Sequence, residues 1–362
     1  MRKKERYIAQ GAIIGFGVTA LIDILMQWLE HNDRGEKFTW ESYDGNRALK
    51  IGFLGSAIGA GIGYVSYEYQ STLEQKQSFN SDEYLKSILR QEDLKQNPEL
   101  LDNAVLIRDK LKLWIVNNFS EKLVSVPENT GSFAKRTANA ASFDIDILLP
   151  FRRDSFDTLE DMYSWTFEQL HQKFGRQAKV VKETKAICIS FEKNGQAINF
   201  DIVPGREIGN YKQDRRLNLY VKPNRFWKRG TCFKIDASTQ RNMTINKPEA
   251  RKVIRLLKIY NDTNYLNIPS VLLEQATVEA LSERKYGVYT SNTDNLLNSM
   301  DYLAEKLGQE FFTDHGNTNN NLNNKIDSYS KSKAVELLRK DITKIEVNSN
   351  YLKEIFEGPY LD

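Results

Sequence analysis

The chain has 362 residues, and its 51 basic and 48 acidic side chains give a formal net charge of +3. This length allows one large domain or two modest ones, and a charge so near balance argues against a protein that coats nucleic acid. Two cysteines and three histidines argue against a disulfide framework, a zinc site built from them, and serine–histidine or cysteine–histidine catalysis. The cysteine content favours a reducing, intracellular compartment.

The first 70 residues contain two apolar stretches that lack the polar alternation of a soluble helix. Residues 7–29 carry one charge, Asp23, and residues 51–67 carry none; Ala48 and Leu49 extend the second stretch to 48–67. A helix needs roughly 17–25 residues to cross a bilayer. Both stretches therefore have the length and composition of membrane-spanning helices.

Small residues recur at every fourth position in both stretches, which allows two helix backbones to approach closely, as membrane helix pairs often do. They are Gly11 and Gly15 in the first stretch and Gly55, Gly59 and Gly63 in the second. The basic residues Arg2, Lys3, Lys4 and Arg6 precede the first stretch, and positive-inside bias keeps that end cytoplasmic. We predict a two-helix membrane hairpin over 1–70 that holds the rest of the chain on the cytoplasmic face of the inner membrane. The alternative is a soluble helical hairpin packed on the main domain.

Beyond this region, residues 71–81 are polar and are predicted to form a linker. Hydrophobic periodicity then predicts helices at 82–96 and 99–119, the second with an apolar stripe through Leu106, Leu113 and Val116. Strands are predicted at 143–149, 179–182, 186–192 and 196–203, with the hairpin signal Lys193-Asn194-Gly195 between the last two. After Pro248, helices are predicted at 249–262, 270–285, 294–311 and 329–345, with an Asn-rich loop at 317–324. We expect a core domain at 82–247 and a helical C-terminal lobe at 248–362.

Three aspartates lie on predicted strands with apolar neighbours. Strand alternation places Asp144 and Asp146 on one face, while Ile145 and Ile147 enter the core. Asp201 lies in an equally apolar strand, where Phe200 and Ile202 point inward. Side-by-side carboxylates repel one another unless a cation lies between them, and hard oxygen ligands suit Mg²⁺ or Mn²⁺. The alternative for an Asp-x-Asp pair alone is a solvated strand face.

Upstream of Asp144, Gly131 and Ser132 precede a potential short helix. Backbone N–H groups at such a turn, together with the Ser132 hydroxyl, can hold a terminal phosphate. The alternative is an ordinary helix N-cap. The combination of Gly-Ser, Asp-x-Asp and a third Asp on a later strand is more specific than any of its parts.

These motifs, GSFAKRT (131–137), SFDIDILLPF (142–151) and INFDIVPG (198–205), resemble the polymerase β-like nucleotidyltransferases, and most closely the cGAS/DncV-like (CD-NTase) and oligoadenylate-synthase-like enzymes. VIRLLKIY (253–260) resembles the family helix whose lysine contacts the donor triphosphate, which implicates Lys258. IPSVLLE (268–274) resembles the helix start whose serine reaches the same triphosphate, which implicates Ser270. Asp314 with Asn317 to Asn321 is similar to a late segment of bacterial members, although His315 stands where proline is usual.

The resemblance covers about residues 82–345 and implies an α+β fold, in which a mixed sheet with flanking helices joins a helical C-terminal lobe across a nucleotide cleft. It also implies that Asp144, Asp146 and Asp201 bind Mg²⁺ or Mn²⁺ and transfer a nucleotidyl group from a nucleoside triphosphate, with pyrophosphate released. The product would be a cyclic or short linear oligonucleotide messenger, read by an effector protein in antiphage-type signalling. No cysteine- and histidine-bearing insertion of the animal DNA-sensing type is present, so DNA sensing is not implied.

Two alternatives use the same residues. The metal chemistry also suits an enzyme that modifies a protein, an RNA or a small molecule. An inactive, membrane-anchored nucleotide-binding module is the non-enzymatic alternative, and the intact aspartate triad argues against it. The segment 222–234, KPNRFWKRGTCFK, combines basic and aromatic residues that suit either nucleotide binding or an ordinary basic loop. Lys258 and Ser270 alone could be a helix-surface lysine and an N-cap.

Overall fold

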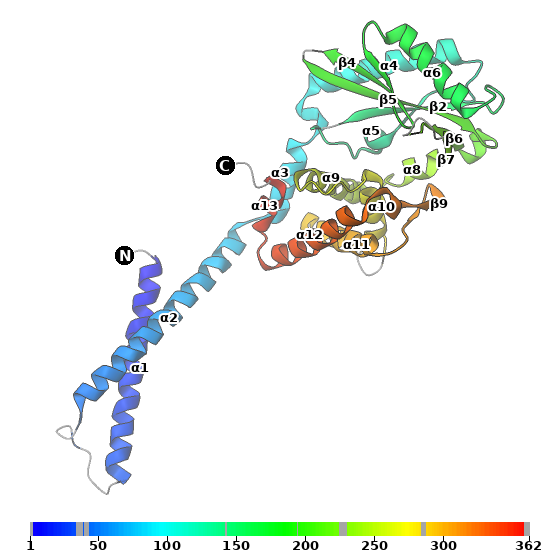
Figure 1. Ribbon diagram of the computed structural model, residues 1–362. Helices are drawn as coiled ribbons and strands as arrows, with labels where there is room; N and C mark the ends of the chain where they lie inside the picture. Colours follow the sequence, from blue (N-terminus) through cyan, green and yellow to red (C-terminus); the bar gives the residue numbers. More distant parts are fainter. Residues whose placement is uncertain are drawn as a thin grey trace. The chain divides into compact units, whose positions relative to one another are not determined.

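The computed structural model describes residues 3–33, 39, 43–141, 143–193, 195–223, 230–283 and 287–357. The chain divides into two compact units, Met1–Asn80 and Ser81–Asp362 (Figure 1). The basic residue Arg2, the turn residue Asn194 and residues 224–229 of the basic and aromatic segment lie outside the described residues.

The first unit is a pair of helices, α1 (Lys3–Asp33) and α2 (Gly45–Ser78), packed through glycine. A Cβ atom added to Gly15 would lie 2.1 Å from the carbonyl oxygen of Gly55, and one added to Gly11 would lie 2.1 Å from that of Gly59. Real Cβ contacts are never so short, so a larger side chain would force the two backbones apart. The predicted spacing of small residues therefore marks the contact face of the pair.

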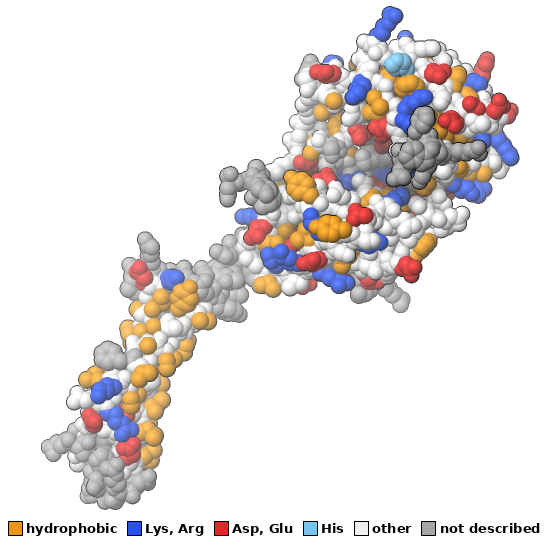
Figure 2. Space-filling view, viewed as in Figure 1, with side chains coloured by type: hydrophobic (Ala, Val, Ile, Leu, Met, Phe, Trp, Pro, Cys, Tyr) orange, Lys and Arg blue, Asp and Glu red, His pale blue; other side chains and the backbone are white. Residues whose placement is uncertain are grey.

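Large apolar side chains of this unit point away from the helix contact (Figure 2). Among the described residues of this unit, the most exposed large apolar side chains are Ile13, Ile14, Leu21, Leu54, Ile58, Ile62 and Val65. Segments Ile8–Glu30 and Gly45–Ser66 are long and apolar enough to cross a membrane. By length and composition these agree with the two apolar stretches read from the sequence.

Polar side chains occupy the contact between the two helices near the α1–α2 connection. Asp23 and Gln27 are buried there, and the Gln27 amide donates to the Asp23 carboxylate over 2.8 Å. The Arg47 guanidinium lies 3.0 Å from Asp23 and also 3.0 Å from Glu30. The single charge of the first apolar stretch is thus paired inside the hairpin.

The predicted linker at 71–81 is wrong for most of its length, because α2 continues to Ser78. Its sequence contains Leu, Glu, Gln and Lys, which have good helix propensity, and it contains neither glycine nor proline. Polarity therefore did not indicate a break in the helix.

The second unit has a sheet lobe and a helical lobe. The sheet lobe contains β1 (Glu128–Thr130), β2 (Asp144–Phe151), β3 (Lys179–Lys182), β4 (Ile187–Lys193), β5 (Gln196–Glu207), β6 (Arg216–Val221), β7 (Thr231–Asp236), η1 (Leu94–Gln96), α4 (Pro98–Phe119), α5 (Gly131–Lys135), α6 (Leu159–Phe174), α7 (Tyr211–Asp214) and α8 (Ala237–Asn242). The helical lobe contains α3 (Ser81–Gln91), α9 (Pro248–Thr263), α10 (Ser270–Ala280), α11 (Asn292–Gly308), α12 (Ser328–Val347), α13 (Tyr351–Glu357), β8 (Thr313–Asp314), β9 (Asn317–Asn321) and η2 (Leu322–Lys325).

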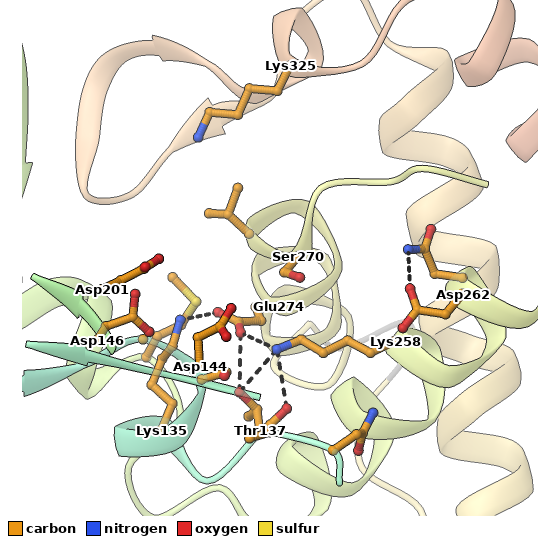
Figure 3. A pocket seen from close by; sticks show the side chains of 17 residues that line it. Lys135, Thr137, Asp144, Asp146, Asp201, Lys258, Asp262, Ser270, Glu274 and Lys325 are labelled. Atoms are coloured by element: carbon orange, nitrogen blue, oxygen red, sulfur yellow. Dashed lines mark hydrogen bonds and ion pairs between the residues drawn. The ribbon is translucent and has the colours of Figure 1, made fainter. Parts of the chain in front are cut away.

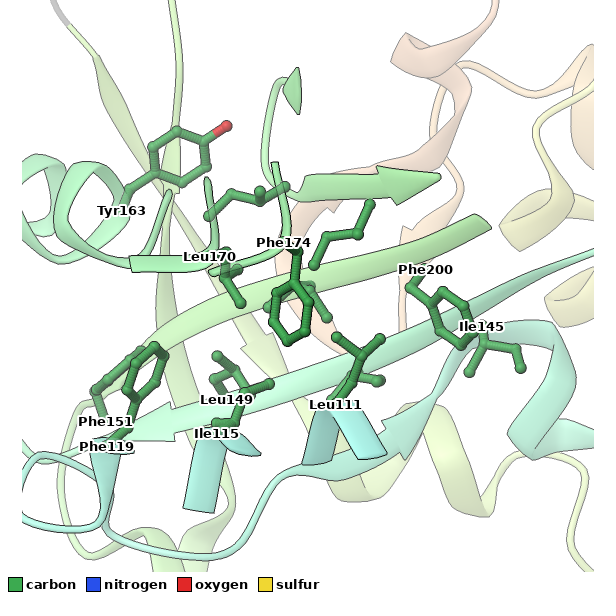
Figure 4. Close-up of a cluster of buried hydrophobic side chains, with 14 of the residues drawn as sticks. Leu111, Ile115, Phe119, Ile145, Leu149, Phe151, Tyr163, Leu170, Phe174 and Phe200 are labelled. Carbon is green, nitrogen blue, oxygen red and sulfur yellow. The ribbon is translucent and has the colours of Figure 1, made fainter. Parts of the chain in front are cut away.

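The seven-stranded sheet is mixed, with the order β1-β2-β5-β4-β3 and with β6 and β7 continuing from β5. Strands β2 and β5 run parallel, and the other pairings are antiparallel. At the predicted hairpin, Lys193 pairs with Gln196. One face of the sheet packs against α4 and α6 (Figure 4). Its core contains Leu111, Ile115, Phe119, Ile145, Leu149, Phe151, Leu170, Phe174 and Phe200. The predicted α+β sheet with flanking helices is confirmed.

Three predictions about local structure are corrected. Leu106 and Leu113 are exposed, because the buried face of α4 carries Leu111 and Ile115 instead. The Asn-rich loop at 317–324 forms strand β9 and helix η2, since β9 pairs with β8. Helix α3 was assigned to the core domain, but it packs on α9 and α11 in the helical lobe. There the Asp82 carboxylate accepts hydrogen bonds from backbone amides at the start of α11.

Candidate active site

The register of β2 and β5 brings the aspartates to one face of the sheet. Asp146 and Asp201 are direct Cα partners across the parallel pair, and Asp144 lies two residues earlier on the same face. The intervening Ile145 and Phe200 are fully buried against α4 and α6. Strand alternation therefore directs all three carboxylates to the opposite face, toward the helical lobe.

A cavity of about 440 Å³ lies at this face, between the two lobes (Figure 3). It is lined by Gly131, Ser132, Lys135, Thr137, Ala138, Asn139, Asp144, Asp146, Asp201, Met243, Lys258, Asn261, Asp262, Ser270, Val271, Glu274 and Lys325. The site residues predicted from the sequence (Gly131, Ser132, Asp144, Asp146, Asp201, Lys258 and Ser270) are all among them. One cavity thus unites residues from β2, β5, α5, α9 and α10.

Gly131 begins α5 and lies directly against an aspartate. Its φ angle is +66°, and a Cβ atom added there would overlap the Asp146 carboxylate at 1.6 Å. Both the backbone conformation and the space therefore require glycine. The residue at the N-cap of α5 is Thr130, so the alternative role of Gly131-Ser132 as an ordinary N-cap is wrong.

Burial and neighbouring carboxylates raise the pKa of Asp146 and of Asp201. Burial, followed by repulsion from Asp144, raises the pKa of Asp146 to about 6, although Lys135 opposes the shift. Burial and repulsion from Glu183, Asp146 and Asp144 raise the pKa of Asp201 to about 7. The fully charged site is therefore unfavourable in the protein alone, and a bound cation would relieve it.

Two further groups lie beside Asp201. The ligand atoms of Glu183, Cys188 and Asp201 lie within 4.8 Å of one another. Burial and the neighbouring Asp201 charge raise the pKa of the Cys188 thiol to about 11, so this thiol stays protonated at neutral pH. Sequence analysis did not identify Glu183. This residue lies between β3 and β4, and the pairing of β4 with β5 places Cys188 opposite Asp201.

The donor set fits Mg²⁺ or Mn²⁺. Asp144, Asp146 and Asp201 supply hard oxygen ligands from two adjacent strands, and these are the ligands that such ions prefer. Burial and neighbouring carboxylates disfavour the charged forms of Asp146 and Asp201, and a divalent ion would neutralise that charge. The three aspartates are the residues that would hold it.

Opposite the aspartates, a buried glutamate joins two lysines. Glu274, on α10, is 2% exposed and forms ion pairs with Lys135 of α5 and with Lys258 of α9, the latter over 2.9 Å. Burial would raise the pKa of Glu274, but the two lysines outweigh it and lower this pKa. Lys258 also donates to the Thr137 carbonyl oxygen over 3.2 Å. It is therefore not a helix-surface lysine, and it ties the helical lobe to the sheet lobe.

Ser270 is the first residue of α10 and lines the cavity, whereas Pro269 occupies the N-cap. Its alternative role as an N-cap is therefore wrong. Sequence analysis did not single out Lys135 and Glu274, although both belong to the motif segments 131–137 and 268–274. Their position within those segments is the signal that could have identified them. Asn139, Asp262 and Lys325 carried no such signal.

Comparison with known proteins places the fold. No protein-family model matches the chain, and no curated protein matches it by sequence. The solved structures that are similar in fold include the following three. CdnC of E. coli MS115-1 with ATP has a TM-score of 0.60 and 15% identity over 78% of this chain and 99% of that chain. The CD-NTase CdnG of Bradyrhizobium diazoefficiens with GTP has a TM-score of 0.58 and 12% identity over 72% and 91%.

The third structure is CdnC of E. coli MS115-1 in its complex with HORMA-deltaN, with a TM-score of 0.56 and 16% identity over 75% of this chain and 96% of that chain. This chain therefore has the cGAS/DncV-like nucleotidyltransferase fold of the CD-NTases, as the motifs predicted. At these identities the comparison shows the fold, and the chemistry depends on the residues of the cavity.

Proposed function

We propose that this protein is a metal-dependent nucleotidyltransferase that joins nucleoside triphosphates into a cyclic or short linear oligonucleotide. The observation that carries the proposal is that Asp144, Asp146 and Asp201 share one cavity with the Gly131-Ser132 turn and with lysine side chains. The fold shared with CdnC and CdnG, which were solved with ATP and GTP, supports nucleoside triphosphates as the substrates. Antiphage-type signalling is the role that we propose for the product.

The cavity residues divide the work of the reaction. Ser132, Lys135 and Lys258 bind the donor triphosphate, and Ser270 contacts it from the start of α10. Asp201 accepts the proton of the attacking ribose hydroxyl while a bond forms between that oxygen and the α-phosphorus. The bond from the α-phosphorus to the bridging oxygen breaks, and pyrophosphate leaves. A divalent ion held by the three aspartates supplies charge neutralisation for the phosphates.

Incubation of the full-length protein in detergent with mixed nucleoside triphosphates and Mg²⁺ or Mn²⁺ tests this proposal. Mass spectrometry should find an oligonucleotide and pyrophosphate, and a chelator should prevent both. A protein that forms no product alone, but labels a protein, an RNA or a small molecule from a nucleoside triphosphate, would belong to the alternative class of transferases. Nucleotide binding without turnover in either assay would indicate the inactive module.

We further propose that α1 and α2 anchor the enzyme in the inner membrane, with the catalytic unit in the cytoplasm. The large apolar side chains that point outward from the hairpin support this, because water would solvate them poorly. Full-length protein should sediment with membranes, resist high-salt extraction and dissolve in detergent. High salt releases a protein held only by basic residues on anionic lipid.

The matched protein for this test is a truncation to residues 81–362, which begins at the boundary between the two units. It should remain in the supernatant and retain nucleotidyl transfer. Full-length protein that is soluble without detergent would support the alternative, a soluble helical hairpin packed on the main domain.

A further inference from the structure

An arginine of α9 joins the end of α3 to the loop that precedes β2 (residues 137–141). The Arg255 guanidinium donates to the carbonyl oxygens of Leu89 and Glu92 at 2.9 and 2.8 Å, where α3 ends beside α9 (Figure 1). The same group donates to the Asn139 side-chain oxygen at 3.0 Å, and the Asn139 amide donates to the Arg255 carbonyl oxygen at 3.1 Å. Arg255 therefore holds a loop of the sheet lobe against two helices of the helical lobe.

Backbone contacts strengthen this junction between α3, α9 and the loop. The amides of Ala140 and Ala141 donate to the Glu92 carbonyl oxygen and carboxylate at 3.0 and 3.1 Å. Leu89 lies in the last turn of α3, where carbonyl oxygens have no partner within the helix and a cation is favourable. The junction requires arginine, because its planar fork of donors reaches several acceptors that a single amine would not.

The loop held by the junction carries cavity residues and leads to the first aspartate. Thr137 and Asn139 line the cavity, and Asp144 follows at the start of β2. Lys258, three residues after Arg255, donates to the Thr137 carbonyl oxygen. Side chains three residues apart lie on the same face of a helix. Arg255 and Lys258 thus hold neighbouring points of one loop from one face of α9.

We propose that Arg255 is a positioning residue, which acts with Asn139 to keep the two lobes in the register that nucleotidyl transfer requires. This inference rests on the proposed function. The metal ligands belong to the sheet lobe, whereas Lys258 and Ser270 belong to the helical lobe, so one triphosphate must contact both. Arg255 is not among the residues that line the cavity, and it therefore acts through Asn139 and α9. A shift of about 1 Å between the lobes would lower the rate by roughly a hundredfold while every group that binds the nucleotide remains.

Steady-state kinetics of full-length Arg255→Ala in detergent, with Mg²⁺ and the nucleoside triphosphates that form product, tests this role. The turnover number kcat should fall by roughly ten- to a hundredfold, while KM should change by less than about threefold. Arg255→Lys keeps the charge but not the fork of donors, so its loss of kcat should be intermediate. The double variant Arg255→Ala/Asn139→Ala should lose little more than Arg255→Ala alone, because both substitutions break the same contact.

Tyr260→Phe is the matched control for loss of stability. Tyr260 lies on the same helix, and its hydroxyl donates to the buried Asp341 carboxylate at 2.8 Å; neither residue lines the cavity. This variant should lower the melting midpoint, as Arg255→Ala should, yet leave kcat unchanged. Mg²⁺ should raise the melting midpoint of Arg255→Ala as much as that of wild type, because the three aspartates lie on two strands of one lobe.

Hydrogen exchange followed by mass spectrometry measures the junction without turnover. The Ala140 and Ala141 amides should exchange at least about tenfold faster in Arg255→Ala than in wild type, and at the wild-type rate in Tyr260→Phe. Faster exchange in Arg255→Ala, together with a wild type that forms no product from nucleoside triphosphates, would refute the proposed function while confirming that Arg255 holds the loop.

Three results would overturn the positioning role: unchanged kcat in folded Arg255→Ala, an equal loss of kcat in Tyr260→Phe, or loss of the response to Mg²⁺ in Arg255→Ala. If Arg255→Ala fails to fold, Arg255→Lys and Asn139→Ala provide the same comparison of kcat with KM.

Discussion

The two units of this chain differ in the residues that they bury: small and polar residues in the hairpin, and large apolar residues in the second unit. In the hairpin, glycine backbones and the polar groups of Asp23 and Gln27 lie inside, while Ile13 is 72% exposed. In the second unit, Ile145 and Phe200 are fully buried, and charged groups line an open cavity. The second unit therefore buries a core of large apolar side chains by itself. The hairpin leaves them for another surface to cover, and a bilayer is such a surface.

Glycine illustrates the same difference at the level of single atoms. Gly15 and Gly59 have no side chain because another helix backbone lies against them. Gly131 has none because a carboxylate lies against it. Gly15 and Gly59 thus allow the two helices to pack closely, whereas Gly131 leaves space for Asp146, a proposed metal ligand. Substitutions at matched positions can separate these roles.

The largest effect is expected at the charged face of the second unit. Asp146→Asn should lower nucleotidyl transfer by roughly a thousandfold or more, since it removes an anionic ligand from the proposed metal site. The fold should persist, because burial already disfavours the Asp146 charge and raises its pKa to about 6. Activity assays and thermal melts measure the two quantities, with exposed Asp154→Asn as the control. Full activity in Asp146→Asn would remove this residue from the site.

Gly131→Ala should lower activity by roughly a hundredfold, because its methyl group would displace the Asp146 carboxylate. Gly195→Ala is the matched control, since Gly195 also has a positive φ angle, +75°, but no atom lies within 4 Å of an added Cβ. Both variants should lose about 1 kcal/mol of stability to backbone strain. Equal activities in the two variants would show that strain alone, and not the contact with Asp146, requires the glycine.

In the hairpin, Gly59→Leu should separate α1 from α2, because an added Cβ would lie 2.1 Å from the Gly11 carbonyl oxygen. Gly61→Leu should be tolerated, since no atom lies within 4 Å of its added Cβ. The overpacked Gly59→Leu variant should lose its monodisperse size-exclusion peak in detergent at a temperature roughly 2–10 °C below that of wild type. If both variants melt like wild type, glycine packing does not hold the hairpin together.

The smallest effect concerns pH and metal. The pKa values of Asp146 and Asp201, about 6 and about 7, lie above their ordinary value of 3.8. Between pH 7 and pH 4 the folded protein therefore binds protons that the unfolded chain does not, so stability contributed by this site rises as pH falls. In chelator, lowering the pH from 8 to 5.5 changes the melting midpoint of the second unit. The change should be about 2–5 °C more favourable in wild type than in the Asp146→Asn/Asp201→Asn variant.

Added Mg²⁺ should raise the melting midpoint more at pH 8 than at pH 5.5, because the ion binds the charged carboxylates. The same ion should leave the double Asn variant unchanged at both values. A wild-type midpoint that is insensitive to Mg²⁺ at pH 8 would argue against a cation between these aspartates.

Much of the site could be predicted from local pattern. Alternation in the segments around Asp144 and Asp201 placed their neighbours in the core and the carboxylates on the other face, because side-chain direction in a strand reverses at every residue. Glycine at every fourth residue identified the contact face of α1 and α2, because residues four positions apart lie on the same face of a helix. These features require no knowledge of distant residues.

Only the tertiary structure placed the groups that complete the cavity. Glu274 meets Lys135 across 139 residues, and Lys325 approaches Lys185 because β8 and β9 dock near β7. Sequence pattern assigned the Asn-rich segment to a loop, because strand pairing and packing, rather than intrinsic propensity, stabilise β9. The sequence determined which face each local side chain occupies. The packing of the two lobes decided which of these faces meet, since contacts between distant residues depend on the whole fold.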